Sequence, residues 1–142
     1  MASSFNILKE RVDEELAKLD LPKVPAELYD PVRYTLEKGG KRTRSVLVLL
    51  ASKLFRDDIE PALNAALAIE VFHNFTLVHD DLMDQAPIRR NRPSVHVNWS
   101  PNHAILSGDA MLVKSYSLLS QCESGNLHMV LKAFNQASMA VC

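Results

Sequence analysis

The stretch ALNAALAIEVFHNFTLVHDDLMD, residues 62–84, contains neither glycine nor proline and is apolar on most sides of a helix. Such a helix is stable only when other elements surround it, so the stretch is predicted to form the central helix of the fold. Pro61 stands where a helix can begin, and Pro87 is expected to end the segment. The fold is therefore expected to be built around one long helix that carries aspartates in its last turns.

Helical patterns of apolar residues cover most of the remaining chain, and no convincing strand pattern accompanies them. Gly39 and Gly40 follow the second pattern and suit a left-handed helix end. No linker or internal repeat divides the chain, so residues 1–142 are predicted to belong to one all-helical domain. The expected helices cover residues 5–19, 25–38, 41–55, 101–119 and 127–142, and residues 86–100 are expected to form a loop.

Composition limits the functions that are open to the chain. Of its 142 residues, 47% are hydrophobic and 23% are charged, as in ordinary globular proteins, and the formal net charge is −1. This balance provides no overall attraction to nucleic acid or acidic membranes. The longest apolar run is too short to span a bilayer, and the N-terminus lacks the layout of a secretory signal or a transit peptide. We expect a cytoplasmic protein without a nucleic-acid partner or a membrane span.

Two of the aspartates share a face of the central helix with a histidine. Asp84 lies about 40° from Asp80 around the helix axis, and His73 lies within about 20° of Asp80. Carboxylates on adjacent turns suit Mg²⁺, which accepts carboxylates together with waters and substrate phosphates. The aspartates are too few to enclose the ion, so positions stay open for phosphate oxygens. The alternative interpretation is a solvated acidic helix end.

Two clusters of basic residues flank the central helix in the sequence. The first is GGKRTR, residues 39–44, at a helix start, where cations oppose the helix dipole and an anion would relieve the conflict. The second consists of Arg89, Arg90 and Arg92, and arginine binds phosphate oxygens with paired hydrogen bonds. Each cluster alone could be a solvated surface. Together with the aspartates, they indicate a site for a metal and phosphate groups.

In this order and spacing, GGKRTR, FHNFTLVHDDLMD, APIRRNRPSVHVNW and AILSGDAML resemble the motifs of the trans-isoprenyl diphosphate synthases, the family of the farnesyl and geranylgeranyl diphosphate synthases. The resemblance covers residues 28–119. It implies an all-α, antiparallel helical bundle of the isoprenoid synthase type around a deep cavity, usually as a homodimer. It also implies a Mg²⁺-dependent trans-prenyltransferase that makes a short-chain isoprenyl diphosphate. In that reaction an allylic diphosphate (dimethylallyl, geranyl or farnesyl) loses pyrophosphate, and the double bond of isopentenyl diphosphate attacks the resulting carbocation.

The resemblance also implies roles for particular residues. Asp80 and Asp84, with Asp81 beside them, would hold the Mg²⁺ ions that grip the allylic diphosphate, and Arg89 would contact the same group. A second set would bind isopentenyl diphosphate and keep it apart from the metal. That set is Lys41, Arg44, His73 and Arg90.

The chain departs from the family in two respects. Ser45 stands where the family usually has proline, and the chain lacks the second aspartate-rich motif that supplies metal ligands from a later helix. It therefore resembles the N-terminal half of such an enzyme, apparently truncated, and is expected to be inactive by itself. Two alternatives are a non-catalytic subunit or regulatory fragment of a prenyl synthase, and a terpene cyclase. The charged clusters argue against the first, and the residues that match an isopentenyl diphosphate site argue against the second.

A few other residues are expected to have structural roles. His79 is expected to form a local hydrogen bond rather than to act in catalysis. Met111, Met129 and Met139 are expected to fill the core.

Overall fold

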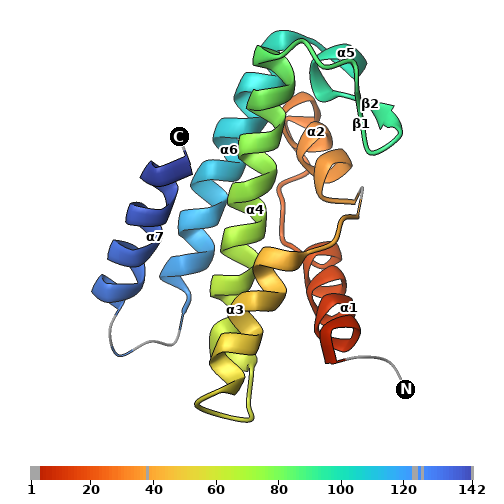
Figure 1. The fold of residues 1–142 in the computed structure, drawn as a ribbon. Coiled ribbons are helices and arrows are strands. Elements are labelled where there is room, and N and C mark those ends of the chain that lie inside the picture. Colours follow the sequence, from red (N-terminus) through yellow and green to blue (C-terminus); the bar gives the residue numbers. More distant parts are fainter. Residues whose placement is uncertain (1–3, 38, 123–124, 126, 142) are drawn as a thin grey trace.

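The computed structural model describes residues 4–37, 39–122, 125 and 127–141 and shows a bundle of helices (Figure 1). Two very short strands, β1 (Ile88–Arg89) and β2 (Arg92–Pro93), pair antiparallel. The predicted all-α bundle is confirmed. The helices are α1 (Ser4–Ala17), α2 (Ala26–Glu37), α3 (Thr43–Lys53), α4 (Glu60–Met83), α5 (Val95–Asn98), α6 (Pro101–Ser120) and α7 (Leu127–Val141).

Helix α4 lies in the middle of the bundle. It packs most extensively against α6 and α3, and both run antiparallel to it (Figure 1). Ala68 and Val71 of α4 are fully buried, as is Met111 of α6. Full burial of a valine or methionine side chain stabilises a fold by roughly 1.5–3 kcal/mol, so these contacts fix α4 as the centre of the core. The prediction of a long central helix from residues 62–84 is therefore confirmed.

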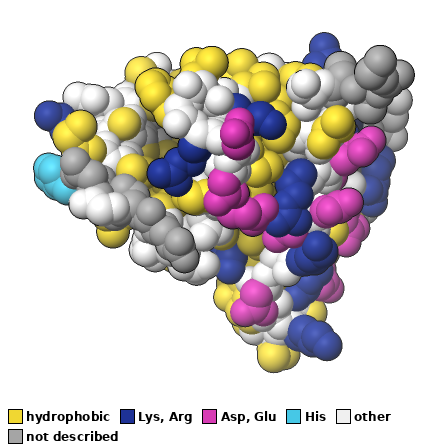
Figure 2. Space-filling view, turned by 90° about the horizontal axis from the view of Figure 1, so that it is seen from below, with side chains coloured by type: hydrophobic (Ala, Val, Ile, Leu, Met, Phe, Trp, Pro, Cys, Tyr) yellow, Lys and Arg dark blue, Asp and Glu magenta, His cyan; other side chains and the backbone are white. Residues whose placement is uncertain are grey.

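Charged residues of α1 lie on the outside of the bundle. Lys9 and Asp13 form an ion pair at 2.6 Å, and Arg11 pairs with Glu15 at 2.7 Å and with Glu60 of α4 at 3.1 Å. Ion pairs at a partly exposed surface contribute roughly 0.2–1 kcal/mol each, so the Arg11–Glu60 pair that joins α1 to α4 assists the docking of α1 more than it determines it. Seen from below, acidic, basic and apolar side chains are interspersed over the surface (Figure 2). No helix among the described residues combines the length and the apolar composition that crossing a bilayer requires.

The segment between α4 and α6 was expected to be a loop, and it contains a small hairpin and the helix α5. The strands pair Ile88 with Pro93 and Arg89 with Arg92, which leaves Arg90 and Asn91 as the two turn residues. Both have positive φ, at 53° and 58°, as the tightest hairpin turns require. The turn could not be predicted, because arginine is seldom found in a left-handed conformation.

Helix α3 begins at Thr43, so the expected start at Lys41 was wrong. Arg42 precedes the helix with φ 50° and ψ 26°, in the left-handed region. A residue in that conformation cannot belong to a right-handed helix, and for a residue other than glycine it costs on the order of 1–2 kcal/mol. Other contacts must therefore hold Arg42 in place.

The expectation that three methionines fill the core was wrong for two of them. Met111 is fully buried, but Met129 and Met139 on α7 are 61% and 77% exposed. Helix α7 packs chiefly against α6, and only Phe134 and Ser138 of α7 are buried. The helical pattern correctly predicted α7, but it could not show how few neighbours this helix has here.

Helices α4 and α6 approach each other closely at Gly108. A Cβ atom at this position would lie 2.3 Å from His79 Nε2. The His79 ring occupies that space, where Nε2 donates to the carbonyl oxygen of Ile105 at 3.1 Å and the ring packs edge-on against Phe75. The hydrogen-bonding role expected for His79 is confirmed, although its partner lies on another helix and not nearby in the sequence.

Gly108→Ala should lower the free energy of unfolding by roughly 1–3 kcal/mol, because the added methyl group displaces the His79 ring and breaks its hydrogen bond. Chemical denaturation of the protein expressed from its complete coding sequence measures this loss. The control is Gly125→Ala, since a Cβ atom there meets nothing within 4 Å and the change should stay within about 0.5 kcal/mol. Equal losses in the two variants would show that the close approach is not required.

Candidate active site

The segment between α2 and α3 borders a basic pocket of about 530 Å³. Lys41 and Arg44 at its edge are exposed, whereas Arg42 and Glu70 are buried beneath it. The four residues expected to bind isopentenyl diphosphate therefore line one pocket, although they come from three separate parts of the chain. The lining residues are Gly40, Lys41, Arg42, Thr43, Arg44, Glu70, His73 and Arg90.

His73 is the neutral member of the basic pocket. Its Nε2 lies 3.2 Å from Nη1 of Arg44. Because a guanidinium can only donate, the imidazole nitrogen accepts in this contact, which requires the neutral ring. Burial, followed by the positive charge of Arg44, lowers the pKa of His73. The ring thus orients the Arg44 side chain without adding charge of its own.

A second pocket of about 700 Å³ adjoins the first, since Arg44 and His73 line both. Side chains of α4 and α7 form its walls, and most of them are apolar. Asp80 also lines this pocket. An apolar space with a basic pocket beside it and a carboxylate at its wall can take a ligand that has a hydrocarbon chain and an anionic head. Its apolar lining includes Ile69, Phe72, Phe75, Leu77 and Val141.

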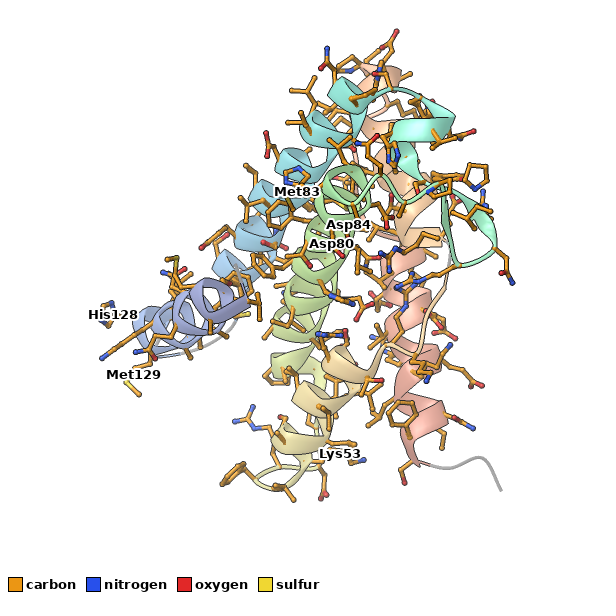
Figure 3. The ribbon with its side chains drawn as sticks, turned by 45° about the horizontal axis from the view of Figure 1, so that its top comes forward. Lys53, Asp80, Met83, Asp84, His128 and Met129 are labelled. Carbon is orange, nitrogen blue, oxygen red and sulfur yellow. The ribbon has the colours of Figure 1, made fainter. Side chains whose placement is uncertain are left out.

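The three aspartates occupy different environments. Asp80 and Asp84 are exposed near the C-terminal end of α4 (Figure 3). Asp81 is only 4% exposed, and both of its oxygens accept from Arg89: Nε lies 2.8 Å from Oδ1 and 3.0 Å from Oδ2, and Nη2 lies 2.5 Å from Oδ1. The hydrogen bond from Arg89 to Asp81 is the main cause that raises the pKa of Arg89 above its ordinary value. Arg89 also lies 3.8 Å from Oδ2 of Asp80.

The exposed pair of aspartates fits a metal that is shared with a substrate. Among the described residues, no three side chains of histidine, cysteine, aspartate or glutamate converge to hold a metal ion by themselves. Mg²⁺ commonly takes one or two carboxylates and fills its remaining positions with waters and substrate phosphates. Asp80 and Asp84, one turn apart, present such carboxylates to solvent. Asp81, which was expected beside them, directs its carboxylate to Arg89.

Arg90 connects the hairpin turn to the GGKRTR segment. Its Nη1 donates to the carbonyl oxygen of Gly39, and a Cβ atom on Gly40 would lie 3.1 Å from its Nη2. Gly40 also has φ 154°, which residues with side chains rarely adopt, so both the backbone and the contact favour glycine. Burial, followed by the charge of Arg42, lowers the pKa of Arg90. This crowding of cations is what an anionic ligand would relieve.

Two residues without an assigned role in the sequence analysis lie beneath the basic pocket. The side chains of Arg42 and Glu70 are 2% and 3% exposed, and Nη1 of Arg42 donates to Oε1 of Glu70 at 3.0 Å. The sequence held one signal of this buried pair, namely the single glutamate in the apolar stretch ALAIEVF, residues 66–72, because a buried carboxylate requires a partner.

The pKa of His73, already low, should rise when inorganic pyrophosphate enters the basic pocket, because a nearby anion favours the imidazolium form. Titration of the histidine ring signals by NMR, with and without pyrophosphate, measures this change. The ring of His128, exposed on α7, serves as the control and should not respond (Figure 3). Pyrophosphate binding that leaves the His73 titration unchanged would place the anion elsewhere.

The sequence is similar to characterised synthases. The polyprenyl synthetase family model matches residues 25–142. The geranylgeranyl diphosphate synthase of Methanosarcina mazei is 45% identical over 100 residues, which cover 70% of this chain and 31% of that protein. The short chain isoprenyl diphosphate synthase of Methanocaldococcus jannaschii is 41% identical over 138 residues, which cover 96% of this chain and 41% of that protein.

Solved structures share the fold. A crystal structure of a geranylgeranyl pyrophosphate synthase matches with a TM-score of 0.93 at 41% identity, covering 99% of this chain and 43% of that one. A geranyltransferase from Helicobacter pylori, complexed with magnesium and isoprenyl diphosphate, matches with a TM-score of 0.76 at 29% identity, covering 95% of this chain and 49% of that one. The chain thus spans less than half the length of each of these four relatives. With the family model matching most of its residues, the chain belongs to the polyprenyl synthetase family.

Proposed function

We propose that this chain forms the substrate-binding walls of a Mg²⁺-dependent trans-prenyltransferase, which joins isopentenyl diphosphate to an allylic diphosphate. The observation that carries this proposal is the pair of adjoining pockets, one basic and one mostly apolar, which meet at Arg44 and His73. Both substrates combine a diphosphate with a hydrocarbon. An arrangement of this kind can hold the two diphosphates apart while bringing the two hydrocarbon parts together.

The basic pocket is proposed as the site for the diphosphate of isopentenyl diphosphate. Lys41, Arg44 and Arg90 supply three cations around it, and His73 holds the guanidinium of Arg44 in place. Hydrogen bonds between such cations and phosphate oxygens are stronger than neutral ones, because both partners are charged. None of these four residues needs a metal ion in order to bind the anion.

The allylic diphosphate is proposed to bind beside Asp80 and Asp84, with its hydrocarbon chain in the apolar pocket. Arg89 lies close to Asp80 and would contact the same diphosphate, while Asp81 holds Arg89 from the buried side. Bound Mg²⁺ would supply positive charge to the leaving oxygens. Asp81 is therefore given a positioning role in addition to the metal role that the resemblance implied.

The proposed reaction begins when the bond between the allylic carbon and its diphosphate oxygen breaks, and the electron pair leaves with pyrophosphate. The double bond of isopentenyl diphosphate then supplies the electrons of the new carbon–carbon bond, and a proton is lost to restore a double bond. Negative charge develops on the leaving oxygens, so a cation that is already positioned there lowers the barrier. The apolar walls keep water away from the carbocation.

The names of the relatives, several of them geranylgeranyl or short chain synthases, support a short-chain product. The basic pocket argues against a terpene cyclase, which needs no second diphosphate site. Cytoplasmic location stays a prediction.

The homodimer is proposed because apolar side chains of α6 are exposed, including Ile105, Leu106 and Val113. A monomeric mass in light scattering at micromolar concentration would contradict it.

Substitutions in the two proposed diphosphate sites should have different kinetic effects. Asp80→Ala and Asp84→Ala should lower kcat by about 10²–10³-fold, because they weaken charge stabilisation in the transition state. Lys41→Ala and Arg44→Ala should instead raise the KM for isopentenyl diphosphate by on the order of 10-fold each, as expected for one lost charged hydrogen bond. Steady-state assays with radiolabelled isopentenyl diphosphate, using the protein from its complete coding sequence, separate these effects.

Arg92→Ala is the control, since Arg92 belongs to the basic cluster of Arg89 and Arg90 but lines neither pocket, and its guanidinium lies 4.1 Å from the centre of the Tyr34 ring. This substitution should leave kcat and the KM for isopentenyl diphosphate nearly unchanged. If all four site variants lost affinity for the allylic substrate equally, the division into two sites would be wrong.

The 142-residue chain expressed alone is expected to give no product in this assay, and turnover at the rate of the complete protein would refute that expectation.

A further inference from the structure

Arg42 links four parts of the fold through one side chain. Its Nε donates to Oδ1 of Asp13 on α1 at 2.8 Å, its Nη1 donates to Glu70 on α4 at 3.0 Å, and its Nη2 donates to the carbonyl oxygen of Leu36 at the end of α2 at 2.8 Å. The backbone of Arg42 stands immediately before α3. Three of its five N–H groups already donate to protein acceptors, and its side chain is only 2% exposed, so Arg42 is committed mainly to the protein around the pocket.

Glu70 holds the start of α3 at two points. Its Oε1 accepts from Arg42, and its Oε2 accepts from the hydroxyl of Ser45 at 3.0 Å. Ser45 occupies a position where the resemblance to the family leads one to expect proline, which could not donate this second hydrogen bond. Lys41 directly precedes Arg42, and Arg44 directly precedes Ser45. The two pocket cations are therefore next to the two residues that Glu70 holds.

The backbone at Arg42 would not hold its position without such contacts. Its φ of 50° is uncommon for any residue except glycine, and no side chain caps the first turn of α3. In a relaxed backbone the directions of the Lys41 and Arg44 side chains would change. Both side chains are exposed, so little packing of their own would restore them.

We propose that Glu70 and Arg42 are positioning residues for the isopentenyl diphosphate site. Their buried ion pair, completed by Ser45, keeps the backbone at Arg42 left-handed, and Lys41 and Arg44 consequently converge on one diphosphate. The proposal rests on the function proposed above. It adds that affinity for this substrate depends on two residues that do not contact it.

The first test is Glu70→Gln in the protein from its complete coding sequence. The KM for isopentenyl diphosphate should rise about 10-fold, since small misplacements of binding groups have effects of this size or larger, while kcat and the KM for the allylic diphosphate change by less than about 2-fold. Ser45→Ala, which removes one hydrogen bond and keeps the ion pair, should give a smaller rise in the same parameter. Calorimetric titration with isopentenyl diphosphate should show the same order of affinities without turnover.

The second test separates positioning from stability. Glu70→Leu removes the buried partner of Arg42 and leaves it only the partly exposed Asp13, whereas the double variant Arg42→Met/Glu70→Leu replaces the buried pair by apolar side chains. The double variant should have the higher Tm of the two and yet keep the raised KM for isopentenyl diphosphate. Leu119→Val, a buried substitution in α6, controls for a general loss of stability and should leave this KM unchanged.

The outcomes separate the two proposals. A KM that returns to the wild-type value as the Tm recovers would show that the ion pair only stabilises the fold, and the inference would be overturned. An affinity for isopentenyl diphosphate that stays unchanged in Glu70→Gln would overturn the inference as well. A wild-type protein that neither turns over nor binds isopentenyl diphosphate would refute the proposed function itself, and the positioning role with it.

Discussion

Helix α4 packs against α3, α6 and other helices, so a charged side chain that it buries needs a partner. Glu70 and Asp81 meet this requirement in the same way, since each binds an arginine from a segment outside the helix. They lie three turns apart and only about 20° from each other around the helix axis. Three of the polar residues that reach a pocket or solvent, His73, Asp80 and the C-cap residue Asp84, form a neighbouring stripe.

This arrangement explains why basic residues lie where local preference disfavours them. Lys41 and Arg44 stand at a helix start, and Arg90 lies close enough to Arg42 for its charge to lower the pKa of Arg90. The buried carboxylates of α4 compensate part of this positive charge from beneath. The positive charge that these carboxylates do not compensate lies on the exposed cations that line the basic pocket. An anion such as a diphosphate can neutralise it.

The sequence allowed the large features to be predicted, because they follow from periodicity. Residues 62–84 have no helix breaker and few polar positions, which is why α4 could be located and placed at the centre. The convergence of Lys41, Arg44, His73 and Arg90 was implied by resemblance alone, since no local pattern brings those four together. The left-handed backbone at Arg42 and in the hairpin turn could not be predicted, because long-range contacts hold these residues against their own preference. Helix α7 shows a further limit, since its period predicted a helix but not the exposure of Met129 and Met139.

The crystal structure of the protein with isopentenyl diphosphate bound would test the central claim most directly. The diphosphate should lie in the basic pocket in contact with Lys41, Arg44 and Arg90, with His73 beside Arg44. Arg42 should stay paired with Glu70 beneath the ligand, with its backbone still left-handed. A diphosphate bound outside this pocket, or one that draws Arg42 away from Glu70 into direct contact, would contradict the claim that the buried pair supports the site without taking part in binding.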